Sequence, residues 1–97
     1  MSNKSSPQPI TTPKLNPMFL LRWEKTQDAH VLLYPEGVIK LNDSAAEILK
    51  CCNGEMTVES IIDHLKLLFT DVSEAELHSG INNFLETAYA KGWITSR

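Results

Sequence analysis

The amino-acid sequence predicts an α+β domain in which a three-stranded antiparallel sheet is followed by three helices. Two observations support this prediction. Between Phe19 and Leu41 the apolar residues alternate with polar ones or form short β-branched runs, which is typical of strands. After Asn42 the apolar spacing changes to that of amphipathic helices and recurs in three segments separated by capping residues. Three short helices joined by tight connections indicate a helix-turn-helix core.

Length and composition indicate one folded domain preceded by a tail. The chain has 97 residues, which is enough for a single hydrophobic core. Residues 1–17 contain four prolines and few apolar side chains, so we expect a disordered N-terminal tail. The folded domain is then expected over residues 18–97.

The cellular setting is expected to be cytoplasmic. No apolar run approaches the length of a membrane helix, and the N-terminus lacks the apolar stretch of a secretory signal. Cys51 and Cys52 are adjacent, a spacing that does not suit an ordinary structural disulfide. We therefore expect a reduced cytoplasmic protein without a membrane partner.

The sheet is expected to consist of Met18–Glu24 and a hairpin formed by Val31–Tyr34 and Val38–Leu41. Pro35 suits the second position of a tight turn and Gly37 tolerates a positive φ, so we expect a turn longer than two residues. Val31–Tyr34 is apolar without alternation, which predicts a central strand covered on both faces. Val38–Leu41 alternates around its lysine, which suits a strand at the edge of the sheet.

Each helix has a recognisable start. The candidate caps are Asn42, Asp43 or Ser44 for the first helix, Thr57 for the second, and Ser73 with Glu76 for the third. Asn53-Gly54 is expected to end the first helix and Gly92 the third. Trp93 can then pack back against the last turn, and Ile94-Thr95 can add a short terminal strand.

The sequence contains no strong catalytic or metal-binding pattern. His30, His64 and His78 have no histidine partner at helical spacing, and no Cys-x-x-Cys motif accompanies them. Cys51 and Cys52 have no base placed beside them, so small apolar packing residues are the favoured interpretation. We expect a protein that is not an enzyme and that has neither a metal site nor a cofactor.

A helix-turn-helix core also suggests DNA binding, which we keep as the alternative function. The formal net charge is −3, and without Lys4 and Lys14 of the tail it is −5. The outward positions of the third helix include Glu74, Glu76 and Glu86, which would face phosphates. We therefore do not expect a nucleic-acid partner.

A binding module remains. Strand Val38–Asn42 at the sheet edge and helix Leu77–Ala88 could form two walls of a groove, in which an extended peptide would add a strand to the sheet. Ile39, Leu41, Ile81 and Phe84 on these two segments could simply be core, and we expect most of them to be. The groove would then be lined by half-exposed residues such as Val38, Lys40, Asn82 and Leu85. An open edge could equally pair with a second copy of the chain, so a homodimer is a further alternative.

The sequence resembles the PqqD family of pyrroloquinoline quinone (PQQ) biosynthesis. The resemblance runs from about Leu15 to Ile94 and is carried by Trp23-Glu24, Gln27–Gly37 with its Leu-Leu-Tyr-Pro-Glu-Gly run, Leu41-Asn42, Ala45–Leu49 and Gly92-Trp93-Ile94. Cys51–Gly54 departs from the family, which more often has an acidic residue before this glycine.

The resemblance implies a fold similar to a winged helix-turn-helix and a peptide-recognition element without enzymatic activity. It implies that the protein binds the precursor peptide PqqA by β-strand addition and presents it to the radical SAM enzyme PqqE. The peptide would pair with the third strand beside the third helix. Carried onto this chain, the peptide-binding residues are Val38, Ile39, Lys40, Leu41 and Asn42 on the strand and Asn82, Leu85 and Glu86 on the helix.

Overall fold

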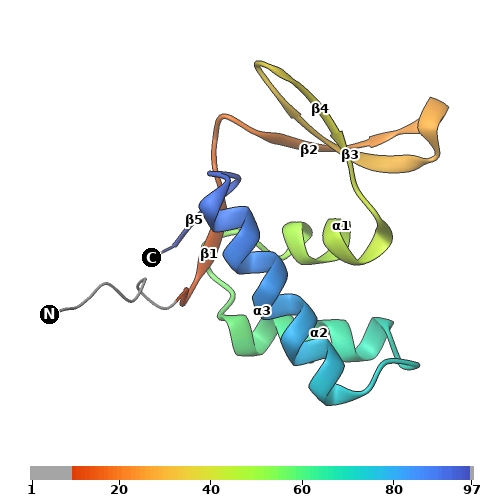
Figure 1. Ribbon diagram of the computed structural model, residues 1–97, viewed down its shortest axis with the longest axis vertical. Helices are drawn as coiled ribbons and strands as arrows, with labels where there is room; N and C mark the ends of the chain where they lie inside the picture. Colours follow the sequence, from red (N-terminus) through yellow and green to blue (C-terminus); the bar gives the residue numbers. More distant parts are fainter. Residues whose placement is uncertain (1–9, 97) are drawn as a thin grey trace, which may run out of the picture.

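The structure is a computed structural model that describes residues 10–96. The strands are β1 (Pro13–Leu15), β2 (Leu20–Glu24), β3 (Ala29–Tyr34), β4 (Gly37–Lys40) and β5 (Ile94–Ser96), and the helices are α1 (Asp43–Lys50), α2 (Val58–Leu68) and α3 (Glu74–Ala90). A 3-10 turn at Lys25–Gln27 joins β2 to β3. Figure 1 shows the sheet of β2, β3 and β4 as one layer above the three helices. The predicted α+β architecture is confirmed.

The three-stranded sheet is antiparallel, in the order β2-β3-β4. The register places Leu21, Leu32 and Ile39 side by side in one cross-strand row, and all three pack in or against the core. The neighbouring row on the other face contains Leu20, Leu33 and Val38.

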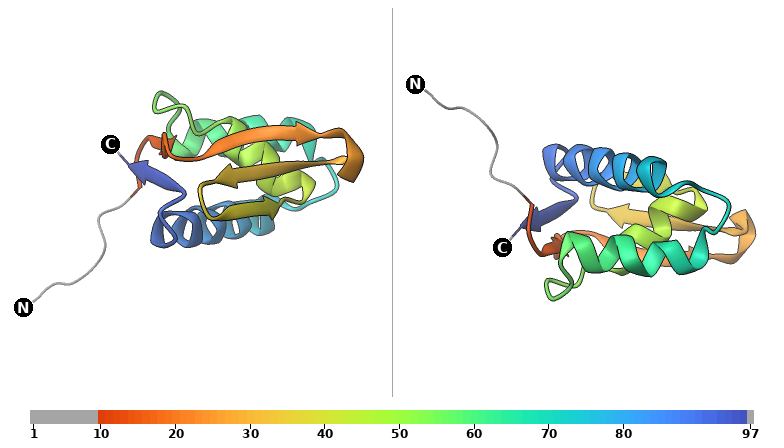
Figure 2. Two further views of the ribbon diagram at one scale, coloured as in Figure 1. Left: turned by 90° about the horizontal axis from the view of Figure 1, so that it is seen from above. Right: turned by 90° about the horizontal axis from the view of Figure 1, so that it is seen from below.

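β3 is the central strand of the sheet, as predicted, and its residues are buried or half-buried. Within residues 10–96, however, no second layer covers the outer face of the sheet. Figure 2 shows the sheet with its outer face uncovered. Leu20 and Val38 are 56% and 57% exposed on that face. Val31 is still fully buried there, because Arg22 and Lys40 occupy the opposite positions and their long aliphatic stems can cover it.

The hairpin between β3 and β4 is tighter than predicted. Tyr34 pairs with Gly37, so the connection is the two residues Pro35 and Glu36. Positive φ angles in the described chain occur at Asp28, Gly54 and Gly92, so neither turn residue nor Gly37 has one. The proline ring fixes a negative φ, and the chain accommodates it in a turn of the unprimed type.

The helix caps follow the local sequence. Asn42 caps α1 by accepting from the Ala45 amide at 2.8 Å, and Thr57 caps α2. Ser73 and Glu76 form the predicted capping box of α3. The capping-box spacing of Ser44 and Glu47 is not used, since the Ser44 hydroxyl donates to the Asn42 side chain. α1 ends at Lys50, a few residues before the left-handed Gly54.

The core lies between the sheet and the helices. Leu32 from the sheet belongs to one buried cluster with apolar residues of all three helices and of β5, which include Ile48, Leu49, Ile61, Ile62, Leu65, Ile81, Leu85 and Ile94. Burial of these side chains fixes the position of α1 beneath the sheet and of α3 beside it.

A second sheet corrects the expected boundary at residue 17. β1 pairs antiparallel with β5 through Pro13–Ser96, Lys14–Thr95 and Leu15–Ile94. Residues 10–17 therefore belong to the fold, while residues 1–9 of the expected tail lie outside the described residues. Proline is compatible with the first position of a strand, so Pro13 does not prevent β1 from forming. The strand that pairs with β1 lies about 80 residues away in the sequence, so the composition of the N-terminal segment does not indicate this pairing.

Candidate functional site

An apolar groove of about 430 Å³ runs between the edge strand β4 and helix α3. Figure 2 shows α3 alongside β4 when the sheet is viewed from above. The groove is lined from β4 and the start of α1 on one side, from α3 on the other, and by the end of α2. Its position agrees with the groove that the sequence predicts between Val38–Asn42 and Leu77–Ala88.

The strand wall has free backbone groups. The Leu41 amide donates to the His30 carbonyl oxygen at 3.0 Å, so these two residues form a hydrogen-bonded pair. Such pairs alternate along an antiparallel ladder, so Ile39 also bonds to β3. The amides and carbonyls of Val38 and Lys40 consequently point away from β3. Within residues 10–96, the sheet has no strand beyond β4.

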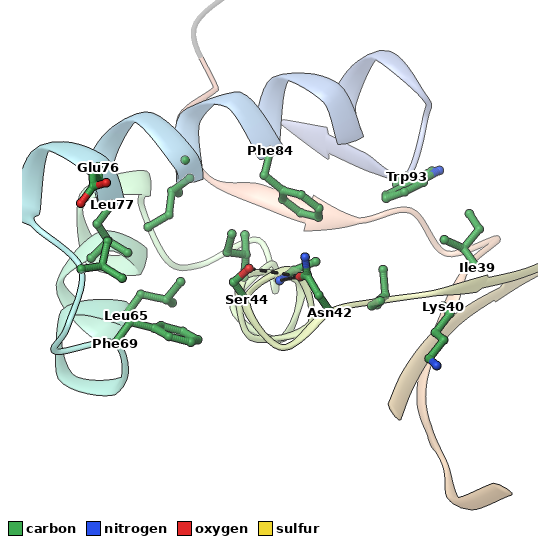
Figure 3. Close-up of a pocket in the computed structure, with 16 residues that line it drawn as sticks. Ile39, Lys40, Asn42, Ser44, Leu65, Phe69, Glu76, Leu77, Phe84 and Trp93 are labelled. Carbon is green, nitrogen blue, oxygen red and sulfur yellow. Dashed lines mark hydrogen bonds between the residues drawn. The ribbon is translucent and has the colours of Figure 1, made fainter. Parts of the chain in front are cut away.

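Four of the five predicted strand residues line the groove: Ile39, Lys40, Leu41 and Asn42. Ile39 points toward α3 and Trp93, whereas the ammonium group of Lys40 points away from α3 (Figure 3). The Asn42 side chain caps α1, which fixes its orientation. Val38 is exposed on the outer face of the sheet and does not line the groove, although its backbone groups belong to the open edge of β4.

The helix wall differs from the predicted one. The groove is lined on α3 by Glu76, Leu77, Gly80, Ile81 and Phe84. None of Asn82, Leu85 and Glu86 lines it: Leu85 is 1% exposed in the core, and Asn82 and Glu86 are exposed on other faces of the helix.

Helical spacing explains this difference. Leu77, Ile81 and Phe84 recur at i, i+4 and i+7, so they form one stripe that is both core and groove floor. From the sequence, this stripe was expected in the core and the groove was expected beside it. The signal that identifies the groove is Phe84, the member of the stripe that is only half-buried.

Trp93 closes one end of the groove, and the local chain holds it there. The Trp93 amide donates to the Ala88 carbonyl oxygen and the Gly92 amide to that of Tyr89, which together form a Schellman motif with Gly92 at φ 79°. The Trp93 ring lies 6.3 Å from that of Phe84, between centroids. The predicted packing of Trp93 against the end of the third helix is thus confirmed.

Asn16 fixes the same segment from the N-terminal side. Its backbone amide donates to the Trp93 carbonyl oxygen at 2.8 Å, and its side-chain amide donates to the Gly92 carbonyl oxygen at 2.8 Å. The sequence interpretation placed Asn16 in the disordered tail and therefore missed this contact. The end of the groove thus depends on the pairing of the first and last described segments.

The cysteines are buried and carry protonated thiols at neutral pH. Cys51 and Cys52 are each 4% exposed and free. Burial raises the pKa of Cys52 to about 12, and the Cys52 thiol donates to the Ile48 carbonyl oxygen at 3.3 Å. Burial also raises the pKa of Cys51. These environments disfavour the thiolate form that a nucleophile requires.

Within residues 10–96, no group of three or more His, Cys, Asp or Glu side chains could hold a metal ion. In the same range, no helix combines the length and the apolar character needed to cross a membrane. The groove is mainly a surface for apolar side chains and backbone hydrogen bonds.

A family model described as "Coenzyme PQQ synthesis protein D (PqqD)" matches residues 29–94. The chain belongs to the PqqD family. The match includes β3, β4 and all three helices, so it spans both walls of the groove. The resemblance inferred from the sequence and the assignment to PQQ synthesis are confirmed.

Similar proteins and a solved structure agree with the PqqD assignment. The chain is 43% identical over 86 residues to a PqqA binding protein of Rahnella aquatilis, covering 89% of this chain and 88% of that one. It is 48% identical over 83 residues to a PqqA binding protein of Pseudomonas fluorescens, covering 86% and 89%. The solution structure of the PqqD truncation of Methylobacterium extorquens PqqCD is similar, with a TM-score of 0.70 and 30% identity over 86% of this chain and 87% of that one. That truncation is a functional, stand-alone recognition element for ribosomally synthesized and post-translationally modified peptides.

Proposed function

We propose that this protein binds the peptide PqqA by adding a strand of the peptide to β4, in the groove beside α3. The observation that carries the proposal is an unpaired strand edge that faces an apolar helix wall across a groove of about 430 Å³. The similar proteins named PqqA binding protein supply the identity of the peptide. The peptide backbone would bond to Val38 and Lys40, and alternate side chains would pack on α3.

The proposal includes presentation of PqqA to the radical SAM enzyme PqqE, which the resemblance to PqqD proteins implies. A carrier of this kind raises the local concentration of a flexible substrate at the enzyme. The protein itself would not catalyse a reaction, and the protonated state of its two buried thiols supports this view. We place this activity in the cytoplasm.

DNA binding, the alternative retained from the sequence, gains no support from the site. Glu76 is the charged residue of α3 that lines the groove, and Glu74 and Glu86 are exposed on the same helix. A recognition helix with this charge would meet phosphates unfavourably. Passage through a duplex-DNA column at near-physiological salt is the expected behaviour.

Amide hydrogen exchange with and without a synthetic PqqA peptide tests strand addition directly. The Val38 and Lys40 amides point outward, so their exchange should slow markedly when the peptide binds. The Ile39 and Leu41 amides already bond within the sheet and serve as the internal control. Slowing confined to β2, or an equal change at all four amides, would contradict the proposal.

The same edge could also pair with a second copy of the chain. Sedimentation of the protein alone and with PqqA separates the two occupants. We expect the peptide complex to contain one copy of the protein, and a dimer that dissociates on peptide addition would show that the two compete for β4.

A further inference from the structure

Gly80 is an unexpected residue in α3. It lies well inside the helix, where glycine is less favourable than alanine. The glycines with positive φ in the described chain are Gly54 and Gly92, so the backbone at Gly80 adopts a conformation that any residue could adopt. Backbone geometry therefore does not explain the glycine.

Crowding does not explain it either. A Cβ atom added at Gly80 would meet no heavy atom of the described residues within 4 Å. Gly80 is exposed and also lines the groove, so the open space beside it adjoins the groove. Helix α3 therefore contains a destabilising glycine at a position where no neighbouring residue of the folded chain requires the absence of a side chain.

The groove continues past the end of the strand wall. β4 ends at Lys40 and α1 begins at Asp43. From Ala45 onward the amides of α1 donate to the Asn42 cap or within the helix, so they offer no strand edge. The walls there are apolar side chains, among them Ala45, Ile48, Leu65, Phe69 and Leu77. A peptide that leaves β4 in this direction finds no strand edge to pair with, and its side chains face mainly apolar walls.

We infer that Gly80 is the point where the bound peptide comes closest to α3, and that it makes room for a bulky apolar side chain just beyond the strand-paired segment. This inference rests on the proposed function. Gly80 then acts as a residue that determines specificity: a side chain at this position would occupy the space that the peptide needs. The ligand has two parts, an extended segment on β4 and an apolar anchor at Gly80.

Gly80→Ala separates helix stability from peptide binding. Alanine should raise the melting temperature by about 4 °C, because it favours the helix. It should weaken binding of a synthetic PqqA peptide about fivefold, and Gly80→Leu about a hundredfold, because the added atoms fill the groove. Calorimetric titration gives the affinities. Ser79→Ala is the matched control, since it changes an exposed neighbour that does not line the groove and should leave the affinity unchanged.

An alanine scan of the apolar residues of PqqA locates the anchor. One peptide residue should lose most of its contribution to binding when the protein carries Gly80→Leu, since the two changes act on one contact. Wild-type affinity of the Gly80→Leu variant, with Lys40→Pro still weakening binding, would overturn the inference and leave strand addition intact. No binding of PqqA to the unaltered protein would overturn the proposed function itself.

Discussion

β1 and β4 are both short strands, but the chain surrounds one and leaves the other open. β1 pairs with β5 on one side, and on the other the Leu15 amide donates to the Cys52 carbonyl oxygen while the Gly54 amide donates to that of Pro13. β4 pairs with β3 on one side and faces the groove on the other. Within residues 10–96, the two terminal segments thus pair with each other around β1, and neither of them covers β4.

This difference indicates that the chain has a segment available to pair with a strand edge, and that this segment pairs at β1 and not at β4. A folded protein normally protects an exposed edge, because unpaired backbone groups invite association. Here the segment that could protect an edge is used to hold Trp93 at the end of the groove, through Asn16. The segment around β1 thus holds one end of the groove in position, and β4 provides the strand wall of the groove.

The largest expected effect lies in the covered region. Ile94 of β5 is 2% exposed in the core, so Ile94→Ala should lower the free energy of unfolding by about 3 kcal/mol. Val38→Ala in β4 is the counterpart, since Val38 is 57% exposed and its change should stay within about 0.5 kcal/mol. Urea denaturation measures both. Similar losses at the two positions would remove the contrast between the strands.

The open region should respond in binding. Lys40→Pro removes an outward-pointing amide, so the affinity for PqqA should fall about tenfold. Lys40→Ala keeps that amide and should bind almost normally. Circular dichroism establishes whether each variant is folded. If the proline variant is folded and binds as well as the alanine variant, the peptide does not pair with Lys40.

A further effect concerns pH and the covered side of β1. The pKa of Cys52 rises from 9.0 to about 12 on burial, so folding favours the neutral thiol. Stability from this burial is present below pH 9 and is lost as pH rises from 9 toward 12, by up to about 1.4 kcal/mol per pH unit. Thermal unfolding between pH 8 and 10.5 measures the slope. Cys52→Ala should show a shallower decline, and an identical slope would exclude the thiol as its source.

The sequence by itself determined the helices, the hairpin and the family. Caps such as Thr57 and Ser73, the Gly92 helix end and the apolar stripe of α3 act over a few residues, and local patterns can record them. Val38–Leu41 was identifiable as an edge strand because its lysine interrupts an apolar run.

Tertiary structure alone decided what joins those elements. The pairing of β1 with β5 and the hydrogen bonds from Asn16 to Gly92 and Trp93 connect residues nearly the whole chain apart. The role of Gly80 emerged only once β4, α1 and α3 enclosed a common space. Local patterns encode helical periodicity and helix caps. The lining of a groove depends instead on the relative orientation of packed helices and strands. That orientation is set by the burial of core residues from the whole chain.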